Sequence, residues 1–152
     1  MRHPSLIPLS HDHHQGLALA LRCRKQALGQ IKPVGREGFE ERAKEVKDFF
    51  SKNLERHFRA EEEVLFPIIN SCASESQQMV EDLIKEHQQI RRQVAGLGEK
   101  KALSKTLFDL GDLLERHIRR EERELFPIFE RRVDVAQAQR AKKEIEKILQ
   151  AC

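Results

Sequence analysis

The chain repeats one fifteen-residue segment with little change sixty positions further on. Residues 54–68 read LERHFRAEEEVLFPI and residues 114–128 read LERHIRREERELFPI, so eleven of the fifteen positions are identical. Amphipathic helices of similar composition share Leu, Glu and Arg by chance, but a shared His, a shared pair of Glu and a shared Leu-Phe-Pro-Ile ending are not expected by chance. We therefore infer an internal duplication, and any fold of this chain contains two closely similar helices.

Apolar residues recur at helical spacing through almost the whole chain, and no window alternates with period two for long enough to form a strand. The spacing predicts four long helices and one shorter helix. The predicted helices are a first one with Leu17, Leu21 and Leu28 after a cap at Ser10, a second from about Phe39 to Leu65, a third from Gln77 to Leu97, a fourth from near Leu103 through Leu125, and a fifth that Asp134 caps.

These segments predict an all-α fold, an antiparallel up-and-down four-helix bundle with a short C-terminal fifth helix. The length is that of one domain, which we assign to residues 1–152. Each repeat carries a proline, Pro67 or Pro127, which cannot donate a backbone hydrogen bond and clashes with the carbonyl four residues back. We therefore expect each proline to kink or end its helix.

Within each repeat a His precedes a Glu by four residues, as His57 precedes Glu61 and His117 precedes Glu121. Positions i and i+4 differ by about 40° around a helix, so both side chains leave the same face, beside the apolar stripe. An ionised carboxylate is costly to bury unless something compensates its charge. Imidazole and carboxylate together suit iron, manganese or zinc. These four side chains therefore predict a metal site in the core of the bundle.

Histidines on the first and third helices complete this pattern. His87 lies on the apolar stripe of the third helix. In the first helix His14 has Leu17 at +3 and Leu21 at +7, so we expect it to face the core, while His13 is the close alternative. Bundles build metal sites from side chains that converge from facing helices. Four imidazoles and two carboxylates would hold two metals, with the carboxylates as bridges and positions left open for a small ligand.

Other polar residues close to these positions have simpler interpretations. His11 is a third candidate in the first helix, and one of the three clustered histidines is expected to face solvent. Glu62 and Glu122 lie about 140° around the helix from the His of their repeat, which favours a solvated role unless the helix is distorted. A lone inward His is more often a hydrogen-bonded core residue, and a lone His–Glu pair is more often a surface contact. Four inward histidines on four helices favour metal binding.

These motifs resemble the hemerythrin-like family of HHE cation-binding domains. The resemblance covers about residues 6–131 and rests on His-Asp-His-His at residues 11–14, on His-x-x-x-Glu-Glu and Leu-Phe-Pro in each repeat, and on Glu86-His87. It implies a four-helix bundle with an oxo- or hydroxo-bridged centre of two iron ions that binds dioxygen reversibly or responds to oxygen, nitric oxide or iron. The ligands that it implies are His14 or His13, His57, Glu61, His87, His117 and Glu121, with the two Glu as bridges.

Two features differ from the oxygen carriers of that family. Those carriers have two His one turn apart in the third helix, whereas Leu83 and Arg91 flank His87 here. They also take their last carboxylate five residues after the His, which makes Glu122 the alternative to Glu121. Zinc and manganese are alternatives to iron for the same donors.

Several other functions compete with reversible gas binding. A ferritin-like di-iron oxidase would carry Glu-x-x-His on two helices, and that motif is absent. A di-iron enzyme that removes peroxide or nitric oxide and a bundle with a purely structural metal are both compatible with the residues. Nucleic-acid binding is disfavoured, because the basic residues are interspersed with Glu and lack interleaved aromatics. We expect a binding protein for dioxygen or nitric oxide rather than an enzyme and, if it is a sensor, one that signals through a partner protein.

Composition predicts a soluble, cytoplasmic protein without membrane contact. Charged residues make up 35% of the chain, and the net charge is only +3. The uncharged stretch 64–74 has eleven residues, whereas a membrane span needs about twenty. No apolar segment typical of a secretion signal follows the first residues. Cys23, Cys72 and Cys152 are far apart and outside any C-x-x-C pattern, which suits a reducing compartment.

Overall fold

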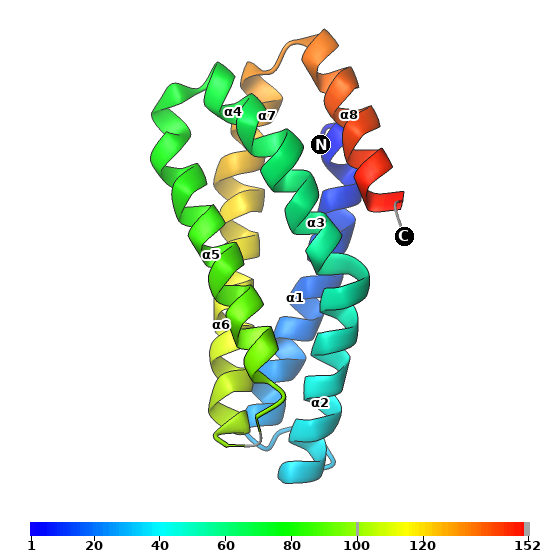
Figure 1. Cartoon of the computed structure of the whole chain (residues 1–152), viewed down its shortest axis with the longest axis vertical. Helices are drawn as coiled ribbons and strands as arrows, with labels where there is room; N and C mark the ends of the chain where they lie inside the picture. The colour runs from blue at the N-terminus through cyan, green and yellow to red at the C-terminus, as the bar shows by residue number, and fades with distance from the viewer. Residues whose placement is uncertain (100, 151–152) are drawn as a thin grey trace.

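The computed structural model describes residues 1–99 and 101–150. In this part of the chain, successive helices run up and down the molecule, and no strand is present (Figure 1). The predicted all-α bundle with a short fifth helix is confirmed. The helices are α1 (Ile7–Ala27); α2 (Arg36–Phe49), α3 (Glu55–Ala60) and α4 (Phe66–Cys72), which follow one another without a break in helical structure; α5 (Gln77–Gly96); α6 (Leu103–Arg120) and α7 (Phe126–Arg132), which are also continuous; and α8 (Val135–Gln150).

The helix boundaries agree with the predictions except at the first two helices. Asp134 caps α8 as expected, and its Oδ1 accepts a hydrogen bond of 2.7 Å from the backbone N–H of Gln137. The prediction that Ser10 caps the first helix is wrong, because a 3₁₀ turn that begins at Pro4 leads directly into α1 at Ile7. Proline favours the start of a helix, since its fixed φ is already helical. The second helix likewise begins three residues earlier than predicted.

Each repeat proline was expected to kink or end its helix, and neither proline ends it. A π-helical turn precedes each proline instead, over Glu61–Leu65 and Glu121–Leu125. In these turns the backbone N–H of Phe66 donates to the carbonyl of Glu61, five residues back, and the second repeat shows the same bond. The hydrogen-bond register therefore shifts just before the residue that cannot donate, and the helix continues for a further turn or more.

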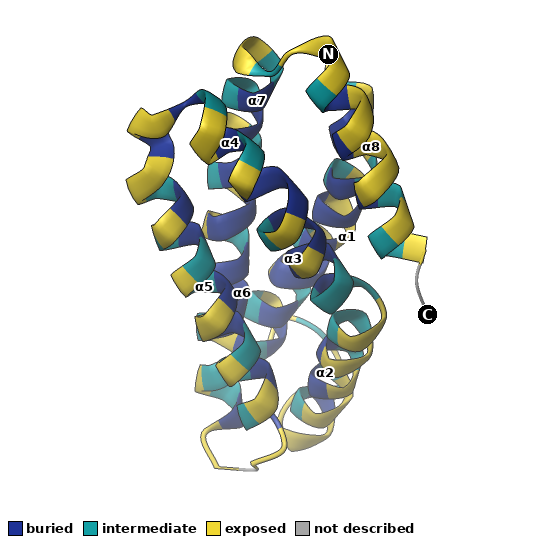
Figure 2. Cartoon of the chain, turned by 45° about the horizontal axis from the view of Figure 1, so that its top comes forward, coloured by how far each residue is buried: buried dark blue, intermediate teal, exposed yellow. Residues whose placement is uncertain are grey.

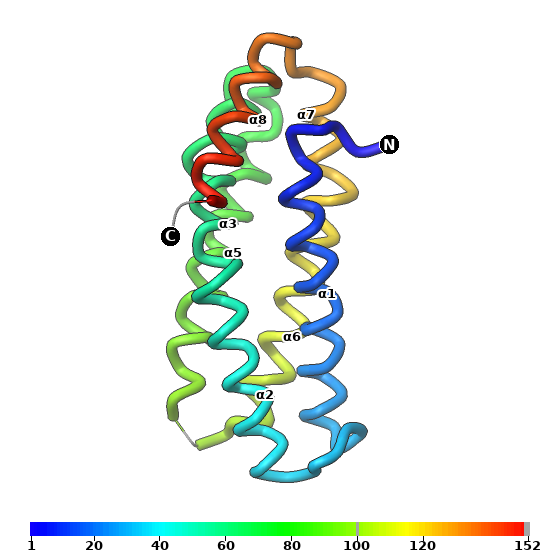
Figure 3. Tube along the Cα trace, turned by 90° about the vertical axis from the view of Figure 1, so that its right-hand side faces the viewer, coloured from blue at the N-terminus to red at the C-terminus, as the bar shows by residue number. Residues whose placement is uncertain are grey.

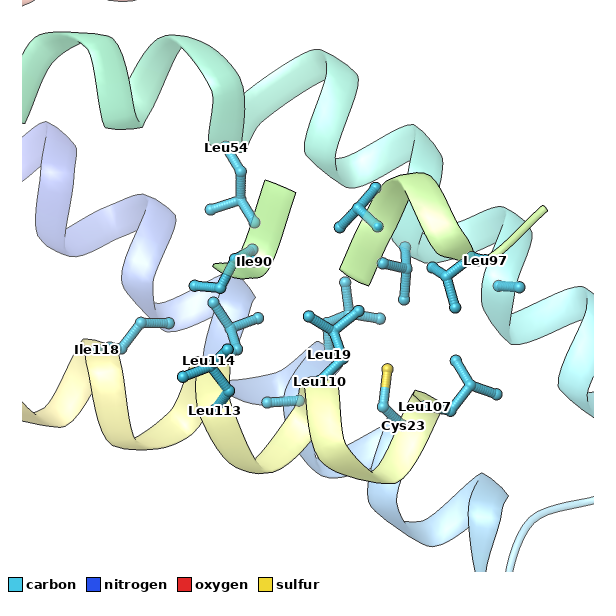
Figure 4. Packing of buried hydrophobic residues seen from close by; sticks show 14 of the residues in the cluster. Leu19, Cys23, Leu54, Ile90, Leu97, Leu107, Leu110, Leu113, Leu114 and Ile118 are labelled. Carbon is cyan, nitrogen blue, oxygen red and sulfur yellow. The ribbon is translucent and has the colours of Figure 1, made fainter. Parts of the chain in front are cut away.

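Buried residues lie on the interior faces of the helices (Figure 2) and form two apolar clusters. On each helix of the predicted metal site, the histidine lies between residues of one cluster and residues of the other. The first cluster includes Leu19, Leu54, Ile90, Leu110 and Ile118 (Figure 4), and the second includes Leu9, Leu65, Leu83, Leu125 and Ile145.

The contact between α1 and α6 is the most extensive in the described chain. α1 lies alongside α6 over most of its length, α5 packs against α6, and α8 packs against α3 and the turn that precedes α1 (Figure 3). Cys23 is buried in the first cluster and Cys72 is half-buried, and both are free thiols; Cys152 lies outside the described residues. In the described part of the chain, no helix is long and apolar enough to cross a membrane.

Gly111 makes the close approach of α1 and α6 possible. A Cβ at this position would lie 2.7 Å from the carbonyl oxygen of Ala20 and 3.2 Å from the Cβ of Cys23. We expect Gly111→Ala to force the two helices apart and to lower the free energy of unfolding by about 1–3 kcal/mol, as overpacking in a core does. Gly96→Ala is the control, because nothing lies within 4 Å of a Cβ there. Urea unfolding of both variants tests this, and equal stability would contradict it.

Candidate metal centre

Six of the seven predicted site residues lie close together in the interior of the bundle, between the two apolar clusters. They come from four different helices, and each is at most 2% exposed. Their ligand atoms fall into two overlapping groups of four, and within each group all atoms lie within 4.8 Å of one another. The six residues are His13 from α1, His57 from α3, Glu61 from the π-helical turn after α3, His87 from α5, His117 from α6, and Glu121 from the π-helical turn after α6.

The seventh residue, His14, is exposed, so the prediction that it faces the core is wrong. The prediction relied on Leu17 and Leu21 as the buried stripe of the first helix. In the structure Leu21 is 44% exposed and Leu17 is only partly buried. The buried face of α1 instead carries Leu9, His13 and Ala20 among others. His13, the alternative, occupies the place in the centre, and His11 is exposed.

His13 and His57 form one half of the centre. Their Nε2 atoms are 3.0 Å apart. The Nε2 of His57 is 3.3 Å from Oε2 of Glu61, and the Nε2 of His13 is 2.9 Å from Oε1 of Glu121. Two donors that each lie about 2.1 Å from one cation, at a right angle, are about 3 Å apart. The separations in this half therefore suit a single cation.

His87 and His117 form the other half with the remaining oxygens of the same carboxylates. The Nε2 of His87 is 3.0 Å from Oε1 of Glu61, and the Nε2 of His117 is 3.4 Å from Oε2 of Glu121. Each carboxylate thus directs one oxygen to each histidine pair. Both carboxylates therefore contact both histidine pairs.

The inner atoms of the centre lack ordinary hydrogen-bond partners. Among the described residues, none of the four carboxylate oxygens of Glu61 and Glu121 makes a hydrogen bond of acceptable geometry, and neither does Nε2 of His87 or His117. Buried polar atoms in folded proteins are nearly always paired, and an unpaired one is costly. A donor set of imidazole nitrogens and carboxylate oxygens fits cations such as iron, manganese or zinc, which would satisfy all of these atoms together.

A second ring of carboxylates holds the outer nitrogen of every histidine. Each Nδ1 lies within hydrogen-bond distance of one carboxylate oxygen, which favours a proton on Nδ1. A neutral ring of this tautomer directs the lone pair of Nε2 inward, as a metal ligand requires. The four contacts are His13 with Glu122 at 2.7 Å, His57 with Asp12 at 3.1 Å, His87 with Glu62 at 2.6 Å, and His117 with Glu86 at 2.7 Å.

The roles of these outer carboxylates were predicted only in part from the sequence. Glu62 and Glu122 were expected to be solvated unless the helix is distorted; each lies in a π-helical turn and is half-buried against a histidine of another helix. Glu122 thus supports His13, and Glu121 is the residue that enters the inner group. The roles of Asp12 and Glu86 were missed. The available signal was that an acidic residue directly precedes both His13 and His87.

Burial and mutual charge set the pKa values of the inner groups in the metal-free protein. Burial and repulsion by Glu121 raise the pKa of Glu61 to about 8. Burial lowers the pKa of His117, but the charge of the nearby Glu121 outweighs this effect and, with the hydrogen bond to Glu86, raises the value to about 10. Burial also raises the pKa of Glu121, yet the adjacent His117 holds it well below its usual range. A cation would replace the protons that these groups share.

The comparison with known families agrees with this geometry. The family described as the hemerythrin HHE cation-binding domain matches residues 5–129. Neither the comparison with curated proteins nor the comparison with solved structures found a match. The matched range contains every residue of the inner group and of the surrounding carboxylates.

The metal-free protein is expected to lose stability as the pH rises from about 5 to about 10. Glu61 and His117 bind protons more tightly in the folded chain. Their contribution is therefore complete below their usual values of 4.5 and 6.5, and it is lost as the pH rises through about 8 and then about 10. The lowered pKa of Glu121 acts only in acid. Urea unfolding of the chelator-treated protein measures this trend, and Glu61→Gln should remove the step near 8. Constant stability would contradict the prediction.

Glu61 is expected to matter more for metal content than His87. Glu61 has an oxygen within 3.3 Å of a histidine nitrogen in each half, whereas His87 belongs to one half. Glu61→Ala should therefore lower the total bound metal more than His87→Ala, which leaves the His13–His57 half intact. Elemental analysis of the purified variants measures this, with Glu63→Ala on the exposed face as the control. Full and equal occupancy in both variants would contradict the assignment of Glu61 as a bridge.

Proposed function

Because the chain belongs to the hemerythrin HHE cation-binding domain family, we propose that its centre holds two iron ions and binds dioxygen or nitric oxide reversibly. The observation that carries this proposal is the division of each buried carboxylate between the two histidine pairs. A single cation beside one histidine pair would leave the carboxylate oxygens and Nε2 atoms of the other half without a partner. Two cations use all four oxygens and all four Nε2 atoms.

The two ions would have the same types of ligand, and only the helices that supply these ligands would differ. His13 and His57 would hold one ion, His87 and His117 would hold the other, and Glu61 and Glu121 would bridge them. Iron with such ligands supplies a redox-active cation with coordination positions free for a diatomic gas. The same donors also suit zinc or manganese, so metal analysis is part of the test.

The inner residues favour binding of a gas over oxidation of an organic substrate. Four neutral imidazoles do less than carboxylates to stabilise high-valent iron. The chain contains no Tyr for a radical, and no Glu-x-x-His motif of the ferritin-like oxidases. Phe58 and Phe66 stack on the ring of His87, and Phe126 stacks on that of His13, so apolar rings exclude water from both halves.

Reversible gas binding would serve sensing, storage or detoxification. A sensor of this kind would pass its signal to a partner protein. Turnover of peroxide or nitric oxide at the same ions is the competing enzymatic function, and the following experiment distinguishes the two.

The protein is expected to contain two irons per chain after aerobic purification and to show near-ultraviolet charge-transfer bands. After anaerobic reduction, one equivalent of dioxygen or nitric oxide should produce a new spectrum that reverses when the gas is removed. Elemental analysis and anaerobic optical spectroscopy measure both results. Glu61→Ala serves as the control, because the loss of a bridge should abolish the spectrum.

Two results would contradict the proposal. Stoichiometric zinc in a colourless protein would indicate a structural metal. Rapid oxidation without a reversible adduct, together with many turnovers of added peroxide, would indicate an enzyme.

A further inference from the structure

Two arginines lie directly outside the ring of carboxylates, one on each half of the centre. Nη1 of Arg91 donates a hydrogen bond of 3.1 Å to Oε2 of Glu62, the same oxygen that accepts from His87. Nη2 of Arg2 donates to Oε1 of Glu122 at 3.1 Å and to its backbone carbonyl at 3.0 Å. Each half thus contains a chain of contacts from an arginine through a carboxylate to a histidine.

Each arginine also reaches its histidine through an aromatic ring. The guanidinium of Arg91 lies over Phe58 at 5.4 Å, and Phe58 stacks on His87 with ring centres 3.8 Å apart. The guanidinium of Arg2 lies over Phe126 at 5.3 Å, and Phe126 stacks on His13 at 5.3 Å. The same arginine therefore restrains both the Nδ1 atom and the face of its histidine, which is more than a surface ion pair does.

The two arginines come from places that the internal repeat does not relate. The repeat relates Glu62 to Glu122. Asp12-His13 and Glu86-His87 lie outside the repeat and share only the pattern of an acidic residue before a His. Arg91 follows His87 by one helical turn in α5, but Leu17 occupies the corresponding position after His13. Glu122 takes its arginine from the segment that precedes α1 instead. Unrelated parts of the chain thus supply an arginine to the outer carboxylate of each half. This indicates that the site requires an arginine there, because duplication alone does not explain the pair.

Arg91 and Arg2 also differ in their other hydrogen-bond partners. The second nitrogen of Arg91 donates to Glu55 at 3.3 Å. Arg2 donates to Glu130 at 2.8 Å, and the backbone N–H of His3 donates to the same carboxylate at 2.6 Å. Ser10 adds a hydrogen bond of 2.7 Å to Glu122. Arg91 and Arg2 therefore share no hydrogen-bond partner, and substitution of one arginine leaves the contacts of the other in place.

We propose that Arg91 and Arg2 are positioning residues for separate metal ions: Arg91 for the ion of His87 and His117, and Arg2 for the ion of His13 and His57. This inference rests on the proposed two-ion centre. Each guanidinium keeps its carboxylate charged and oriented, and the carboxylate in turn keeps Nδ1–H occupied and Nε2 directed at the metal. Residues that orient a metal-bound His typically change metal affinity by 10- to 100-fold when they are removed.

Release of iron to a chelator tests this inference. The full chain is loaded anaerobically with two equivalents of ferrous iron, and transfer to a coloured ferrous chelator is followed over time. Arg91→Ala and Arg2→Ala should each release one of the two irons about 10-fold faster and the other at the wild-type rate. The double variant should release both irons fast. Arg59→Ala is the matched control. Among the described residues Arg59 pairs only with exposed Glu63, so this variant should leave both rates unchanged.

A second variant separates positioning from a general effect on folding. In a Glu62→Gln background, Arg91→Ala should have a smaller effect on release, because the carboxylate through which Arg91 acts has lost its charge. Wild-type release kinetics in both arginine variants, or equal acceleration of both irons in each single variant, would overturn the inference. Failure of the wild-type chain to take up two irons would instead overturn the proposed function on which it rests.

Discussion

Glu61 and Glu121 are fully buried beside each other in the middle of the bundle, and the surrounding structure compensates the cost of that burial. An ionised carboxylate in an apolar core is unfavourable without a nearby positive charge. Four more carboxylates surround the histidines, so six lie at the centre, and in the described chain only Arg2 and Arg91 pair with any of them through arginine hydrogen bonds. Both arginines also pair with carboxylates outside the centre, Glu130 and Glu55. Cations held by the inner group would therefore add positive charge directly beside the buried carboxylates.

The fold gives two successive glutamates of each repeat different tasks. Glu61 points into the centre, whereas Glu62 contacts His87 on α5, and the second repeat places Glu121 and Glu122 in the same way. The π-helical turn begins at the inner Glu in both helices and shifts the backbone hydrogen-bond register. The proline that follows has no backbone N–H, so this shift leaves no donor unpaired at the proline. The Leu-Phe-Pro ending of the repeat is therefore part of the local structure that holds the site.

Features within one helix were predictable, and features that depend on the relation between helices were not. The bundle, the repeat and both His-x-x-x-Glu pairs follow from spacing along the chain. The choice between His13 and His14 depends on which face of α1 meets α6, and the wrong face was preferred because Leu17 and Leu21 suggested a buried stripe. The contacts of Asp12 and Glu86 with histidines of other helices depend on distances that no single-helix pattern contains. The acidic residue that directly precedes both His13 and His87 was the available indirect signal for them.

The inner and outer parts of the centre follow different symmetries, and this difference bears on function. The repeat relates His57, Glu61 and Glu62 to His117, Glu121 and Glu122, and each half gains one further His from outside the repeat, so two cations would have the same types of donor. The aromatic surroundings obey the repeat only in part: Phe66 and Phe126 stack on His87 and His13, but Phe58 also stacks on His87 at 3.8 Å, whereas Ile118 occupies the corresponding position of the second repeat. Arg91 comes from α5, whereas Arg2 comes from the segment before α1. Two ions with equal ligands would thus lie in unequal environments, which is a physical basis for one of them to bind a small ligand in preference to the other.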